Sequence, residues 1–112
     1  MRARALLVAL SVVVLGLFGC KGDPGKCEKA ARNFATLTYW KRADAEIAKL
    51  PKEQRDADRK KRLSKFTNEL ESEIDFIVKQ CVNANNDDQV DCMLAAKTGD
   101  EAAKCADLIE PD

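Results

Sequence analysis

The chain has 112 residues, with 19 Lys plus Arg, 19 Asp plus Glu, five Cys and no His. This length fits one small domain. Without His, the chain lacks the usual general base near neutral pH and the commonest transition-metal ligand, and its balanced charge does not indicate a nucleic-acid partner.

The first segment, residues 1–19, reads as a secretory signal. Arg2 and Arg4 give it a positive start, and residues 5–19 carry no charge. That apolar run is shorter than the roughly 20 residues that a helix needs to cross a bilayer. A positive start, a short apolar core and small residues at its end predict a segment that is removed on export.

The end of this segment, Leu17, Phe18, Gly19 and Cys20, resembles the lipobox of bacterial lipoproteins. The resemblance implies cleavage before Cys20 and attachment of acyl chains, palmitate among them, to that residue. Phe18 departs from the pattern, which usually has a small or β-branched residue there. The alternative is an ordinary signal peptide or a short anchor helix in which Cys20 has no role.

The lipoprotein reading also predicts where the protein is found. Lys21 follows the lipidated Cys20, and a residue other than Asp at that place favours the outer membrane in well-studied Gram-negative bacteria. Three acyl chains anchor a protein far more firmly than one. Residues 20–26 form a short tether, so the helical domain predicted over 27–109 would lie close to the membrane surface, with 110–112 as a tail.

Two long amphipathic helices are predicted on either side of Pro51. Apolar residues recur at helical spacing before it, at Cys27, Ala30, Phe34, Leu37, Trp40, Ile47 and Leu50. They recur after it at Leu63, Phe66, Leu70, Ile74, Ile77 and Cys81. Such stripes predict helices that fold back as an antiparallel pair. Of the adjacent rings Tyr39 and Trp40, one at most faces the core, and Trp40 is favoured.

Two shorter helices follow. Two pairs have the spacing of a capping box: Asn86 with Gln89, and Thr98 with Glu101. They predict helices over 87–97 and 99–109, the second ended by Pro111. The predicted fold class is all-α: a long antiparallel hairpin plus two short C-terminal helices, stapled by disulfides.

The four remaining cysteines indicate two disulfides, because their number is even in a small exported chain. Cys27 and Cys81 lie on the two stripes, at the same end of an antiparallel pair. A turn at Gly99 would bring Cys92 beside Cys105. We therefore favour Cys27–Cys81 with Cys92–Cys105; Cys27–Cys105 with Cys81–Cys92 stays open. No close pair such as C-x-x-C is present, so neither a metal, a redox site nor a cofactor is predicted.

The segment from Cys81 to Cys105 resembles the C-x10-C-x12-C helical tail of small exported proteins and predicted lipoproteins of myxobacteria, in which a further cysteine corresponds to Cys27. The resemblance implies a helical four-cysteine fold. It implies no catalytic activity.

Charge is segregated along the chain, with a net of +7 over residues 20–65 and −9 over 66–112. The basic maximum between 52 and 62 has two interpretations. One is a solvated helix start with i,i+4 ion pairs, Asp56 with Lys60 and Asp58 with Arg62. The other is a patch that docks an anionic envelope component or protein. The patch would consist of Lys52, Arg55, Arg59, Lys60, Lys61 and Arg62.

The sequence therefore predicts a lipid-anchored cell-envelope protein with a binding or structural role and no catalysis, held to the membrane through Cys20. The alternative is a periplasmic inhibitor or immunity-type lipoprotein that acts on one enzyme partner. Aromatic residues do not interleave with the basic residues, which argues against nucleic acid. No oligomeric state is predicted.

Overall fold

A computed structural model describes residues 22–108. Four α-helices and one short 3-10 turn make up this part: α2 (Pro24–Ile47), α3 (Lys52–Ala84), α4 (Asp87–Ala95), α5 (Gly99–Cys105) and η2 (Ala106–Leu108). The described residues contain no strand. The predicted all-α class is confirmed.

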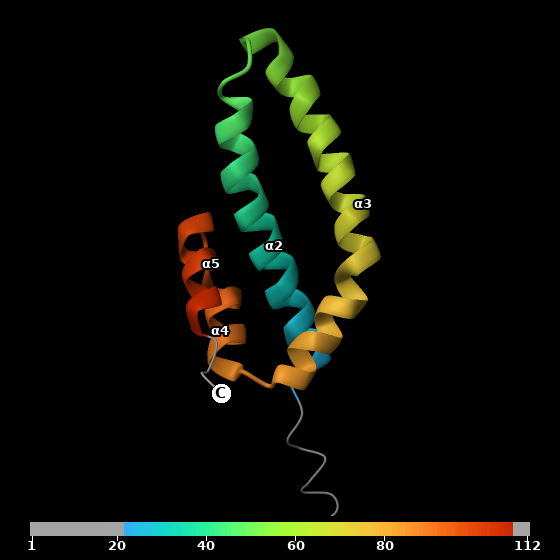
Figure 1. The fold of residues 1–112 in the computed structure, drawn as a ribbon, viewed down its shortest axis with the longest axis vertical. Coiled ribbons are helices and arrows are strands. Elements are labelled where there is room, and N and C mark those ends of the chain that lie inside the picture. Colours follow the sequence, from blue (N-terminus) through green and yellow to red (C-terminus); the bar gives the residue numbers. More distant parts are fainter. Residues whose placement is uncertain (1–21, 109–112) are drawn as a thin grey trace, which may run out of the picture.

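Helix α2 is the centre of the fold. It contacts each of the other α-helices. In Figure 1, α3 runs antiparallel on one side of α2, while α4 and α5 lie on its opposite side. The long hairpin expected around Pro51 is present, and the two C-terminal helices pack on α2 rather than on α3.

The start of α2 is fixed by a side-chain cap. The Asp23 carboxylate accepts hydrogen bonds from the backbone N–H groups of Gly25 (2.9 Å) and Lys26 (3.4 Å). Pro24 occupies the first helical position, where a missing N–H costs nothing. Part of the segment expected as a tether, 24–26, is therefore the first turn of α2.

An arginine closes the bend between the two long helices. Arg55, in the first turn of α3, donates to the backbone carbonyls of Leu50 (3.0 Å) and Ala48 (3.1 Å). These carbonyls lie just beyond the end of α2, where helical partners are lacking. Pro51 caps α3, which begins at the following residue, Lys52.

Both short helices begin at the predicted caps but end earlier than predicted. Asn86 Oδ1 accepts from the Gln89 N–H (3.1 Å), and Thr98 Oγ1 accepts from the Glu101 N–H (3.1 Å). Helix α4 stops at Ala95 because the next residue is extended. Helix α5 gives way to η2 after Cys105.

An amide from α2 stabilises the end of α4. The Nδ2 group of Asn33 donates to the carbonyls of Met93 (2.7 Å) and Ala96 (2.9 Å). Both carbonyls lie at the C-terminus of α4, where intrahelical donors are missing. One polar side chain thus ties the short helix to the centre of the fold.

The buried core is small and made mostly of small side chains. Its members are Cys27, Ala30, Ala43, Ile47, Ile74, Val90, Ala96, Ala102 and Cys105. Cys27, Ala30 and Val90 form a cluster against which Cys81 and neighbouring side chains pack. By contrast Leu63, a member of the predicted stripe, is 50% exposed.

Candidate functional site

The four cysteines of the described part form two disulfides. Cys27 is joined to Cys81, with Cα atoms 5.9 Å apart, and Cys92 to Cys105, with Cα atoms 5.6 Å apart. This is the favoured pairing, expected for Cys27 and Cys81 from the stripes and for Cys92 and Cys105 from a turn at Gly99. The first bridge clamps α2 to α3 at the open end of the hairpin, and the second closes the α4–α5 pair. Cys20 lies outside the described residues.

The arginines of the predicted basic patch are engaged within the fold. Arg59 forms an ion pair with Asp44 of α2, and its guanidinium stands over the Trp40 ring, 4.9 Å from the centroid. Arg62 pairs with Glu46 of α2 and with Asp58, both at 2.5 Å. Arg55 closes the bend. These three residues therefore hold α3 against α2.

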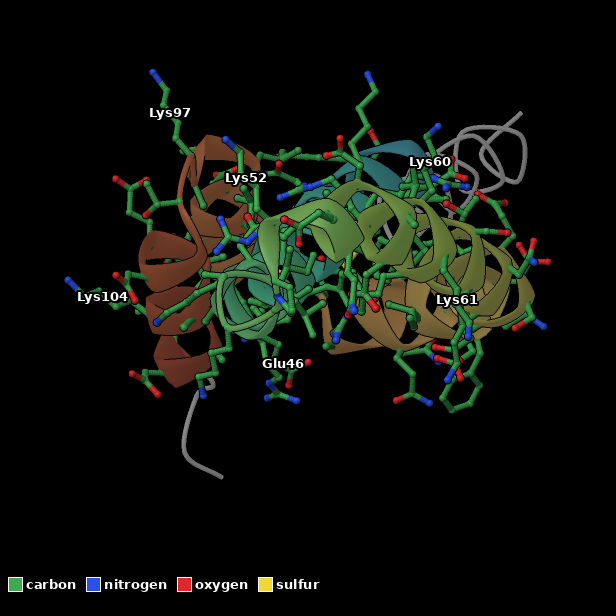
Figure 2. All side chains as sticks on the ribbon, turned by 90° about the horizontal axis from the view of Figure 1, so that it is seen from above. Glu46, Lys52, Lys60, Lys61, Lys97 and Lys104 are labelled. Atoms are coloured by element: carbon green, nitrogen blue, oxygen red, sulfur yellow. A yellow bond between two sulfur atoms is a disulfide. The ribbon has the colours of Figure 1, made fainter. Side chains whose placement is uncertain are left out.

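The lysines of the patch do not converge. Within residues 22–108, no ion pair involves Lys52, Lys60 or Lys61. Seen from above in Figure 2, the three side chains leave the hairpin in different directions. Of the two i,i+4 pairs expected here, Asp58 with Arg62 is present, whereas Asp56 with Lys60 is not among the ion pairs of this part.

The basic first half of the domain pairs with its acidic second half in the fold. Basic side chains of α2 meet acidic side chains of the later helices: Lys26 with Asp91, Arg32 with Glu71, and Lys41 with Asp100. The hydrogen bond from Arg32 holds the pKa of Glu71 below its ordinary value, and that from Lys41 does the same for the pKa of Asp100. These groups are exposed, so each pair contributes little to stability. Together they favour the observed packing of α2.

A groove of about 1010 Å³ runs along one face of α2. The α2 residues on this face are Cys27, Ala30, Ala31, Phe34, Ala35, Thr38, Tyr39, Arg42, Ala43 and Glu46. The lining from α3, from α4 and from Asn86 between them comprises Arg62, Ile77, Gln80, Cys81, Ala84, Asn86, Gln89, Val90 and Met93. Its volume is at the upper end of the range typical of small-molecule sites, roughly 300–1,000 Å³.

The two ends of the groove differ in chemistry. Beside the Cys27–Cys81 bridge, small side chains are joined by the uncharged amides of Gln80, Asn86 and Gln89. Near the bend, charged side chains join the lining: Arg42, Glu46 and Arg62. Arg62 and Glu46 are paired with each other. Arg42 has no ion pair or hydrogen bond within residues 22–108.

Aromatic rings hold the hairpin together above the groove. Tyr39 stacks on Phe66 of α3 with ring centroids 4.3 Å apart, and its hydroxyl donates to the Arg62 carbonyl (3.3 Å). The prediction that Trp40 faces the core is wrong. Both rings are only half-buried, and Trp40 lies in a second hollow of about 380 Å³ beside α5. Adjacent residues point about 100° apart on a helix, and partners on both sides of α2 cover them separately.

No group of three or more potential metal-ligating side chains occurs within residues 22–108. None of the helices described there is both long and apolar enough to span a membrane. Comparison of the chain with protein-family models, with curated proteins and with solved structures found no match.

Sequence reasoning did not identify the groove. Spacing along a helix shows which residues share a face, and the predicted stripes share only part of the groove lining: Cys27, Ala30, Phe34, Ile77 and Cys81. Spacing does not show whether the opposing helix approaches closely enough to fill the space. The signal that was present is the side-chain size on α2: alanines at 30, 31, 35 and 43 leave room that larger side chains would occupy.

Proposed function

We propose that this chain is a lipid-anchored cell-envelope protein that acts by binding and not by catalysis. The observation that carries the anchor is the pattern at residues 1–20: two arginines, an uncharged run and then Leu17, Phe18, Gly19 and Cys20. The disulfides support it, because two bridges account for every described cysteine and fit an oxidising compartment. Cys20 is the remaining cysteine.

The position of the first described residue, Gly22, fits a domain held close to a membrane. Gly22 lies against α3, where an added Cβ would be 3.2 Å from the Cα atom of Val82. Only one residue separates it from Cys20. The lipid would therefore place the open end of the hairpin at the membrane surface, with the bend and its lysines directed away. We propose the outer membrane as the location, on the basis of Lys21.

The binding role rests on the groove. A large, open and mainly apolar hollow beside a disulfide is a feature of ligand sites rather than of a purely structural spacer. Its charged residues are arginines and a glutamate, a set that lacks a nucleophile paired with a base. Binding is therefore the activity that the site supports best.

Metabolic labelling tests the anchor. Cells that express the full chain are grown with radiolabelled palmitate, and the protein is followed by autoradiography and membrane fractionation. We expect the wild-type chain to be labelled and to sediment with membranes. Cys20→Ser should remain unprocessed and unlabelled. The matched control is Ser11→Ala, a similarly small change within the leader, which should be labelled like wild type.

The same strains separate the two binding roles. The lipidated protein is cross-linked in intact cells and its partners are identified by mass spectrometry. One enzyme recovered in a one-to-one complex, with its activity suppressed, would support the inhibitor alternative. Label on Cys20→Ser equal to that on wild type would exclude the lipoprotein proposal itself.

A further inference from the structure

We propose that the groove along α2 binds a long-chain fatty acid, with the hydrocarbon tail in its apolar part and the carboxylate at Arg42. This proposal goes beyond the proposed function. It rests on residues of the described domain, and its test is separate from the test of lipidation at Cys20.

The apolar part of the groove offers a continuous hydrocarbon-like surface. Phe34 and Ala35 of α2, Ile77 of α3, and Val90 and Met93 of α4 all line it. Three helices thus contribute to one surface, and a flexible thioether such as that of Met adapts to an alkyl chain. Burying each methylene of a tail there contributes on the order of 0.8 kcal/mol.

The groove is long enough for one fatty-acyl chain. Cys27 and Arg42, both in the lining, are 15 residues apart on α2, which corresponds to about 22 Å at 1.5 Å per residue. A bilayer leaflet, half of a hydrocarbon core about 30 Å thick, sets the reach of an ordinary acyl tail at roughly 15 Å. A tail that begins at Arg42 would therefore lie within the groove.

Charge complementarity selects an anionic head group. Arg62 and Glu46 neutralise each other, which leaves the Arg42 guanidinium as the charge in the lining without a partner in the described part. A guanidinium binds a carboxylate in a bidentate geometry that is stronger than a neutral hydrogen bond. A free fatty acid supplies one carboxylate and one tail, the two features that the groove presents.

Photochemical cross-linking of the full chain tests the proposal. The protein is reconstituted in phosphatidylcholine vesicles with palmitate that carries a diazirine near its end, and the adducts are mapped by mass spectrometry. We expect adducts on the lining residues of α2 and α4, competed by unlabelled palmitate and not by hexadecanol. Arg42→Gln should lower the yield by on the order of tenfold, the effect of losing one charge-assisted contact.

Matched variants make the result specific. Lys29→Gln removes one positive charge from α2 outside the lining and should not alter the yield. Ala35→Phe fills the groove and should abolish labelling while the helical circular dichroism stays unchanged. If this variant unfolds, the labelling yield of Arg42→Gln tests the proposal by itself. Adducts spread over the whole surface, or equal yields with Arg42→Gln and wild type, would overturn the proposal.

Two further outcomes would also overturn it by naming another occupant. Competition by phosphatidylglycerol but not by palmitate would assign the site to a phospholipid. Labelling of Cys20→Ser together with no labelling of the wild type would mean that the chain's own lipid fills the groove.

Discussion

Removing the Cys27–Cys81 bridge should cost more stability than any other change to a pair of residues in this domain. The bridge closes a loop of 54 residues, whereas Cys92–Cys105 closes one of 13. In the chain-entropy treatment, these closures remove unfolded-state freedom worth about 4 and about 3 kcal/mol. Cys27 and Cys81 also contribute to the cluster in which α2, α3 and α4 meet.

The core is poorly able to compensate for that loss. Of the nine buried apolar residues, four are alanines and two are cysteines. For a domain of this size, about 1 kcal/mol shifts the melting temperature by about 4–8 °C. The double variant Cys27→Ala/Cys81→Ala should therefore melt roughly 15–30 °C lower than wild type.

Thermal melts followed by far-ultraviolet circular dichroism provide the assay. The matched control is Cys92→Ala/Cys105→Ala, which should melt at a temperature between those of wild type and the first variant. A melting temperature for Cys27→Ala/Cys81→Ala within a few degrees of wild type would refute the reasoning. It would mean that side-chain packing, and not the bridge, holds the hairpin closed.

Three further predictions concern single residues. Gly99→Ala should destabilise the domain by about 1–3 kcal/mol in urea unfolding, because the added Cβ would lie 2.9 Å from the Leu37 carbonyl oxygen of α2. The control Gly25→Ala should leave the stability unchanged, because its nearest neighbour would be 3.5 Å away. Asn33→Ala should cost about 1–2 kcal/mol by the same measurement, because two carbonyls at the end of α4 lose their donor. The folded-state pKa of Glu71 is lowered, so its stabilisation is present above its unfolded value of 4.5 and is lost as the pH falls. The urea midpoint should therefore drop between pH 6 and pH 3 (roughly the titration range of a carboxylate), and Glu71→Gln should reduce that drop; an equal drop in both proteins would contradict the role of Arg32.

The parts of the fold that depend on local patterns could be predicted from the sequence. The period of the apolar residues predicts both long helices, and the spacing of Asn86 and Thr98 from the residues that follow them predicts where the two short helices begin. The bridge between Cys27 and Cys81 follows from the stripes once the hairpin is antiparallel. Each of these inferences needs only spacing and the direction of the chain.

The remaining features depend on contacts between distant residues. Arg32 meets Glu71 across 39 positions, and Gln89 donates to the carbonyl of Cys105 instead of completing a capping box with Asn86. The three arginines of the basic patch pair with α2 or bond to the carbonyls just beyond its end. They therefore join α3 to α2 and are not free to dock an anionic partner. Spacing along one helix does not predict such partners, because they depend on how closely the helices approach.

Intact-mass spectrometry of the protein extracted from envelope membranes, under non-reducing conditions, tests the central claim most directly. The account predicts a chain of 93 residues that begins at Cys20, carries the mass of the lipid and is four hydrogens lighter than its reduced form. A chain that retains residues 1–19, or one that lacks any lipid mass, would contradict the account.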